Sequence, residues 1–146
     1  MAVRKPQRHP DDLLKQAGLR RTSVRVSVLK ILAESGQPLG APQILELLPP
    51  GIDRVTLYRT LNTLTDKKLL HRVRGDDQIW RYGLGEFDAH ARHAHAHFVC
   101  DSCGTVECLS EQPVAPLARK NSRVRAGYRV DYSEVLVHGA CPDCSK

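Results

Sequence analysis

Two pairs of cysteines carry the strongest chemical signal in this 146-residue chain, Cys100-x-x-Cys103 and Cys141-x-x-Cys144. A two-residue spacer lets the backbone turn and aim both sulfurs at one ion, so two such pairs can supply four thiolates to a tetrahedral zinc. One isolated pair could be a redox motif. Two pairs, neither of them within a thioredoxin-like pattern, favour a closed structural zinc site.

A second group of potential ligands precedes the first cysteine pair in the sequence HARHAHAHFVC. In an extended segment, alternation places His93, His95 and His97 on one face and Cys100 on the other. We therefore expect a second metal site, to which the fifth cysteine, Cys108, could add a thiolate. Mixed His and Cys ligation suits zinc better than iron or manganese. The alternative is a solvated histidine run, with Cys108 as a small buried apolar residue.

The excess positive charge of the chain lies in a different segment from these ligands. Residues 1–83 contain 15 Lys and Arg against 8 Asp and Glu, whereas residues 84–146 contain 7 against 8. All five cysteines follow residue 99. This division predicts a nucleic-acid-binding module in the first segment and a metal-binding module in the second. A basic face without a partner is the alternative on charge alone.

The basic segment has the pattern of short helices followed by a β-hairpin. Thr22 and Asp53 are placed to cap two helices, and Pro42 suits the first turn of a helix that would bury Ile44, Leu47 and Leu48. Residues 70–73 and 79–82 alternate as two strands. This order predicts a winged helix-turn-helix, whose last helix, over residues 53–63, enters the major groove of DNA.

The second segment is predicted to be a small β-α-β module. Residues 84–92 are expected to be a linker, and residues 93–146 the metal-binding domain. Its strands are expected near residues 98–99 and 105–109, its helix from Pro113 to about Arg125, and its last strand over residues 128–137. The whole chain is therefore expected to be α+β, with domains 1–83 and 93–146.

Other classes of protein fit the sequence poorly. It lacks the Walker A, GxSxG, Rossmann and HExxH motifs, so we expect no enzyme and no small-molecule substrate. No apolar run reaches the length of a membrane helix, and the basic start is not followed by the apolar region of a signal peptide. We expect a cytoplasmic protein with no membrane partner.

Several motifs, spread from about residue 14 to residue 144, resemble the ferric uptake regulator (Fur) superfamily of metal-responsive repressors. They are the segment GLRRT at residues 18–22, VTLYRTL at residues 55–61, HAHFVCxxCG at residues 95–104 and GACxxC at residues 139–144. The resemblance implies a homodimer held by the second domain, an inverted-repeat double-stranded DNA operator, and repression when a regulatory metal is bound. In ligand pattern the chain is most similar to the zinc-sensing branch of the family.

The resemblance also implies site residues. The structural zinc ligands would be Cys100, Cys103, Cys141 and Cys144. Candidate ligands of a second divalent metal, expected to be zinc, are His71, His90, His95, His97 and Cys108. Cys108 stands where relatives usually carry Glu or Asp. One ligand position stays open, because His90, Asp88 or Glu86 could take the place of His71. The expected DNA contacts are Arg20, Arg54, Thr56, Tyr58, Arg59 and Arg72.

Two alternatives to a zinc-responsive repressor stay open at this point. One is an iron-, manganese- or peroxide-sensing repressor of the same family that tolerates Cys108. The other is a protein that a structural zinc stabilises and that binds DNA constitutively. In that case the histidine run would have no regulatory role.

Overall fold

The computed structural model describes residues 9–75, 77–85, 95–113, 127–128 and 135–146. The chain forms two compact units, residues 1–87 and residues 88–146. Most of the expected linker, including His90, and the helix expected after Pro113 lie outside the described residues. Among the helices that the structure describes, none combines the length and apolar character needed to cross a bilayer.

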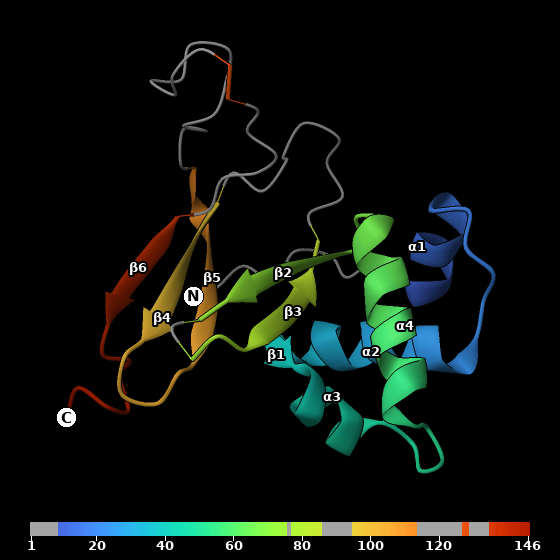
Figure 1. Ribbon diagram of the computed structural model, residues 1–146, viewed down its shortest axis with the longest axis horizontal. Helices are drawn as coiled ribbons and strands as arrows, with labels where there is room; N and C mark the ends of the chain where they lie inside the picture. Colours follow the sequence, from blue (N-terminus) through green and yellow to red (C-terminus); the bar gives the residue numbers. More distant parts are fainter. Residues whose placement is uncertain (1–8, 76, 86–94, 114–126, 129–134) are drawn as a thin grey trace. The chain divides into compact units, whose positions relative to one another are not determined.

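The first unit contains four described helices, drawn as coiled ribbons in Figure 1. They are α1 (Pro10–Gln16), α2 (Ser23–Ser35), α3 (Ala41–Leu47) and α4 (Arg54–Asp66). The predicted caps are confirmed: the Thr22 hydroxyl accepts a hydrogen bond from the Arg25 N–H at 3.3 Å, and Asp53 Oδ1 accepts one from the Thr56 N–H at 2.8 Å. Side-chain caps of this kind satisfy amides that the first helical turn leaves unpaired.

The four helices bury one apolar stripe each. In α4 the stripe is Leu57, Leu61 and Leu64, whose helical spacing places them on one face. The prediction for α3 is wrong in one position, because Leu47 is 60% exposed. Ile44 and Leu48 do enter the core. Helix α3 is only two turns long, and its last residue has turned away from the core before the chain leaves the helix.

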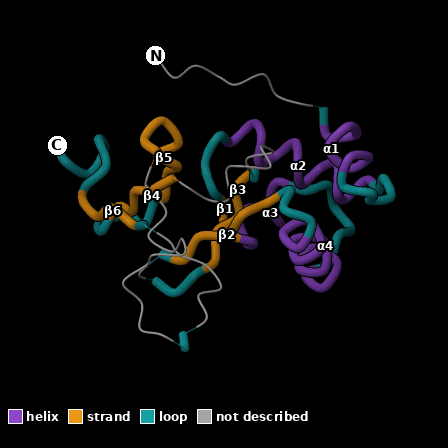
Figure 2. The backbone as a smooth tube through the Cα atoms, turned by 90° about the horizontal axis from the view of Figure 1, so that it is seen from above, coloured by secondary structure: helices purple, strands orange, loops and turns teal. Residues whose placement is uncertain are grey.

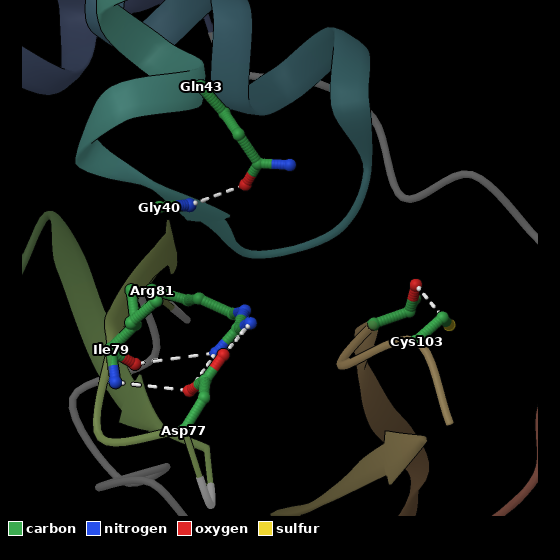
Figure 3. Close-up of polar contacts among 7 residues, drawn as sticks. Gly40, Gln43, Asp77, Ile79, Arg81 and Cys103 are labelled. Carbon is green, nitrogen blue, oxygen red and sulfur yellow. Dashed lines mark hydrogen bonds and ion pairs between the residues drawn. The ribbon is translucent and has the colours of Figure 1, made fainter. Parts of the chain in front are cut away.

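A three-stranded antiparallel sheet completes the first unit. Its strands are β1 (Leu39–Gly40), β2 (Leu70–Arg74) and β3 (Trp80–Leu84), in the order β1-β3-β2. The hairpin β2–β3 matches the predicted wing, whereas β1 was not predicted. Gly40 of β1 also starts α3, since its N–H donates to Gln43 Oε1 at 2.9 Å (Figure 3). Figure 2 shows the three strands, in orange, beside the helices of the same unit.

The second unit contains the sheet β5-β4-β6. Its strands are β4 (His95–Cys100), β5 (Val106–Pro113) and β6 (Leu136–Gly139). Strand β4 pairs antiparallel with β5 and parallel with β6, and Figure 1 shows it between them. Pro113, which was expected to start a helix, instead ends β5. Among the described strands β5 is at the edge of this sheet, where proline is tolerated.

Candidate metal centre and nucleic-acid surface

The sheet of the second unit brings the two cysteine pairs together. Cys100 ends β4, and its register partner on the parallel strand β6 is Gly139, two residues before Cys141. A tight turn with Gly104 at φ 74° follows Cys103. As a result, four sulfur atoms lie within 4.8 Å of one another. They belong to Cys100, Cys103, Cys141 and Cys144. The structure therefore gathers all four residues that the sequence predicted as one ligand set.

This sulfur cluster has the dimensions of a zinc site. Four sulfurs at about 2.3 Å from a tetrahedral zinc lie roughly 3.8 Å from one another, and the Cys103 and Cys141 sulfurs are 3.8 Å apart. The Cys141 N–H donates to the Cys100 sulfur at 3.3 Å. Four thiolates and no open position are typical of structural rather than catalytic zinc.

The thiols of the cluster differ in acidity because their neighbours differ. Backbone N–H groups, that of Cys141 first, lower the pKa of Cys100 to about 6. The Thr105 hydroxyl lowers the pKa of Cys103. Hydrogen bonding to the neighbouring thiols, that of Cys141 first, raises the pKa of Cys144 to about 12. A cation at the centre would favour all four thiolates at once.

A polar link beside the cluster was not predicted from the sequence. The Asp101 N–H donates to the Gly139 carbonyl at 2.8 Å, and the Asp101 carboxylate lies 2.9 Å from His138 Nδ1. The two residues come from the two cysteine-bearing segments. They are 37 positions apart, so sequence spacing alone held no signal for this contact.

The second candidate site begins with a pair on the same sheet. His97 on β4 and Cys108 on β5 are register partners, so both side chains leave the same face of the sheet. The β4–β5 register shifts between His95 and Ala96. Strand β4 includes the backbone of His95, whereas its side chain lies outside the described residues.

His71 lies in the first unit, on β2. Its Nδ1 is 2.9 Å from the Leu84 carbonyl oxygen. A carbonyl can only accept, so Nδ1 donates and the neutral ring carries its lone pair on Nε2. Zinc-binding histidines commonly have this arrangement, in which one ring nitrogen donates to a backbone carbonyl and the other binds the ion. The hydrogen bond therefore prepares Nε2 of His71 as a ligand atom.

Helix α4 exposes the side chains expected to contact DNA. Arg54 and Arg59 are exposed, and the Tyr58 side chain is 46% exposed. Thr56 has an additional role at the helix start, since its hydroxyl donates to Asp53 Oδ2 at 2.9 Å. Sequence reasoning missed Val55, an apolar residue that is 58% exposed on the same helix. Its chemistry suits contact with a thymine methyl group.

Two further predicted DNA contacts lie outside this helix. Arg20 is exposed before α2, and its carbonyl accepts a hydrogen bond from Arg25 Nη1 at 2.6 Å. Arg72, on β2, places its guanidinium carbon 4.7 Å from the centre of the Trp80 ring. Arg74 also approaches this ring, at 5.4 Å. The indole thus holds two cations on the wing, a role for Trp80 that sequence reasoning did not identify.

The turn of the wing is fixed by an ion pair. Arg81 donates to both carboxylate oxygens of Asp77, at 3.0 and 2.7 Å, and the Ile79 N–H donates to the same carboxylate at 3.0 Å (Figure 3). These bonds lower the pKa of Asp77 to about 2, with the Arg81 contact the largest cause.

Comparison with known proteins identifies the family. The family model described as the ferric uptake regulator family matches residues 16–144. The chain belongs to the ferric uptake regulator family. The Mycobacterium tuberculosis transcriptional regulator FurA is 30% identical to this Fur-family chain in an alignment 141 positions long, which covers 90% of the chain and 87% of FurA.

Two further relatives of this Fur-family protein have zinc in their names. The zinc uptake regulation protein of Escherichia coli is 29% identical, with 88% of the chain and 75% of the relative covered. A solved zinc uptake regulator in complex with zinc and DNA has a TM-score of 0.67 and 25% identity, with 92% of the chain and 89% of that structure covered.

These findings confirm the predicted family and the α+β fold class. The chain is a metal-responsive transcriptional regulator, and regulators of this family bind DNA as dimers. Its relatives include iron- and zinc-uptake regulators, so family membership alone does not assign the metal.

Proposed function

We propose that this protein is a zinc-sensing repressor that acts in the cytoplasm. A homodimer would bind an inverted-repeat operator when each subunit holds a regulatory zinc in addition to a structural one. The observation that carries the choice of zinc is the direct pairing of His97 with Cys108. A thiolate beside an imidazole is a borderline-soft donor set, which suits zinc better than iron or manganese.

The structural zinc would be held by the four clustered cysteines. The sulfur spacing and the lack of any non-sulfur donor in this set support that assignment. Zinc here would tie the end of β6 to the turn after β4. Because a closed set of four ligands leaves no position for exchange, this ion would stabilise the second unit without responding to zinc supply.

The regulatory zinc would be held by His97 and Cys108 of the second unit and by His71 of the first. His95 would complete the set, with His90 as the alternative to His71. Three observations support these ligands: the shared face of His97 and Cys108, the Nδ1 hydrogen bond of His71, and the placement of His95 on β4. An ion with ligands from both units would restrict the orientation of the DNA-binding unit.

The consequence for DNA binding follows from linkage. A dimer whose DNA-binding units have a fixed orientation presents both α4 helices at the spacing of successive major grooves. A coupling of about 1–3 kcal/mol between zinc and DNA binding changes DNA affinity about 5–150-fold. Arg54, Tyr58 and Arg59 would read the operator, and Arg72 and Arg20 would contact its phosphates.

Zinc titration against a labelled operator, selected from random duplex DNA by the zinc-loaded protein, tests this function. We expect the His95→Ala/His97→Ala double variant to keep one zinc per subunit and to lose the zinc-dependent gain in operator affinity. The control is His9→Ala, which removes an exposed imidazole outside the proposed ligand set. Equal operator affinity of the double variant and the wild type would contradict zinc sensing and favour a constitutive DNA-binding protein.

A further inference from the structure

The imidazole of His71 lies directly over a glycine. His71 and Gly83 are register partners on β2 and β3. A Cβ added at Gly83 would lie 2.8 Å from His71 Cε1, 3.1 Å from His71 Nε2 and 3.3 Å from Pro38 Cγ. Carbon atoms in proteins do not approach this closely without displacement of a neighbour, so the ring occupies the space that a side chain at position 83 would need.

Backbone conformation does not account for this glycine. The left-handed φ values of the described residues occur elsewhere, for example at Gly36 and Gly104, and Gly83 is not among them. It also lies inside a strand, where glycine weakens the sheet and often marks a close approach of another group. The group that approaches here is the His71 ring.

The His71 ring cannot move aside without losing a hydrogen bond. Its Nδ1 is held by the Leu84 carbonyl at 2.9 Å, and Pro38 lies beside the same space. A methyl group at position 83 would press on the ring edge that carries Nε2. Relief requires the ring to rotate, which breaks the Nδ1 hydrogen bond and redirects Nε2. The fold can absorb this change because only the end of one side chain must move.

We propose that Gly83 is a positioning residue for the regulatory zinc, acting through His71. The missing side chain lets His71 keep Nδ1 on the Leu84 carbonyl and present Nε2 as a ligand. This inference rests on the proposed zinc-sensing function, and it adds a residue that sets zinc affinity without donating a ligand atom itself.

A double-mutant cycle tests the proposal on the full-length protein loaded with one zinc per subunit. The variants are Gly83→Ala, His71→Ala and the two combined, with affinity for a second zinc measured by competition with a fluorescent chelator. We expect Gly83→Ala to weaken this affinity about 10–100-fold, the usual effect of losing an outer-shell partner of a ligand. In the His71→Ala background, Gly83→Ala should alter zinc affinity by less than about twofold, because no imidazole ring remains for the added methyl group to displace.

A second readout separates positioning from loss of structure. The imidazole ¹⁵N signals of His71, recorded with no zinc in the second site, should show the Nδ1-protonated tautomer in the wild type and a mixture in Gly83→Ala. Gly40→Ala is the matched control, since a Cβ there would meet its neighbours at 3.5 Å or more, which is ordinary contact. This control should keep the wild-type affinity and tautomer.

Failure of this inference differs from failure of the proposed function. Wild-type zinc affinity in Gly83→Ala together with reduced affinity in His71→Ala would overturn the role of Gly83 alone. An equal loss from Gly83→Ala with and without His71 would also overturn it, because the effect would not pass through the ring. Wild-type affinity in His71→Ala would remove His71 from the ligand set and overturn this inference, whereas the zinc-sensing function would be overturned only by operator binding that does not depend on the second zinc.

Discussion

His97 and Cys108 are direct cross-strand partners on β4 and β5. Side chains of directly opposed residues have Cβ atoms about 4.5–5.5 Å apart, close enough for an imidazole and a thiolate to bind one ion. The pairing is a property of the second unit alone. It therefore supports a second metal site independently of any ligand from the first unit.

Replacing Cys108 should weaken the second zinc and leave the first. Cys108→Ser removes a proposed direct ligand, and loss of even an outer-shell partner costs about 10–100-fold in metal affinity, so we expect a loss of at least that size. Competition with a chelator measures it. When cobalt replaces zinc, the variant should also lack the thiolate-to-cobalt absorption of the second ion. Unchanged affinity and an unchanged cobalt spectrum would exclude Cys108 as a ligand.

Local signals explain what the sequence could predict of the fold. The caps Thr22 and Asp53 act on amides a few residues away, so the residue types alone indicate where α2 and α4 start. Strand β1 was missed because its two residues pair with β3, more than 40 positions further along the chain. Leu47 was placed in the core because it follows Ile44 at helical spacing, but α3 ends at Leu47 and that side chain is exposed.

In the candidate sites, too, local spacing could be predicted from the sequence and contacts between distant segments could not. The cysteine pairs are visible as spacing, and the structure brings them together. The Asp101–His138 contact, the stacking of Arg72 on Trp80 and the position of the His71 ring over Gly83 depend on which strands become neighbours. Such contacts have no sequence pattern of their own, so they required the three-dimensional arrangement.

Arg59 should carry sequence specificity. An arginine that binds a guanine edge is worth about 1–3 kcal/mol of discrimination, so Arg59→Ala should weaken binding to the selected operator and change binding to random duplex DNA much less. Anisotropy titrations on both duplexes measure this ratio. An equal loss on the two duplexes would assign Arg59 to the phosphate backbone instead.

Arg72 should contribute through phosphate contact. Its removal in Arg72→Ala should weaken specific and random DNA binding alike and reduce the slope of log affinity against log salt by about one. Trp80→Leu, which removes the ring beneath the guanidinium, should weaken DNA binding in the same direction but leave the salt slope closer to that of the wild type, because the charge is still present. A normal salt slope in Arg72→Ala would remove this residue from the interface.

The Asp77–Arg81 pair should give the first unit a defined loss of stability in acid. The pKa of Asp77 is lowered from 3.8 to about 2 in the folded protein, so its stabilising contribution is present above about pH 4 and is lost as the pH falls toward 2. Asp77→Asn should therefore be less stable than the wild type at pH 7, by less than about 1 kcal/mol because the carboxylate is partly exposed.

Urea unfolding followed by the fluorescence of Trp80, the single tryptophan, checks this prediction in the first unit. The stability difference between Asp77→Asn and the wild type should shrink between pH 4 and pH 2. A difference that stays constant across this range would show that the ionised carboxylate is not its origin.

In the proposed function a second zinc switches DNA binding on. The most direct test is the operator affinity of the wild-type protein prepared with one and with two zinc ions per subunit, measured by anisotropy at one fixed salt concentration. We predict that the two-zinc protein binds the selected operator about 5–150-fold more tightly than the one-zinc protein. Equal affinity of the two preparations would contradict the account.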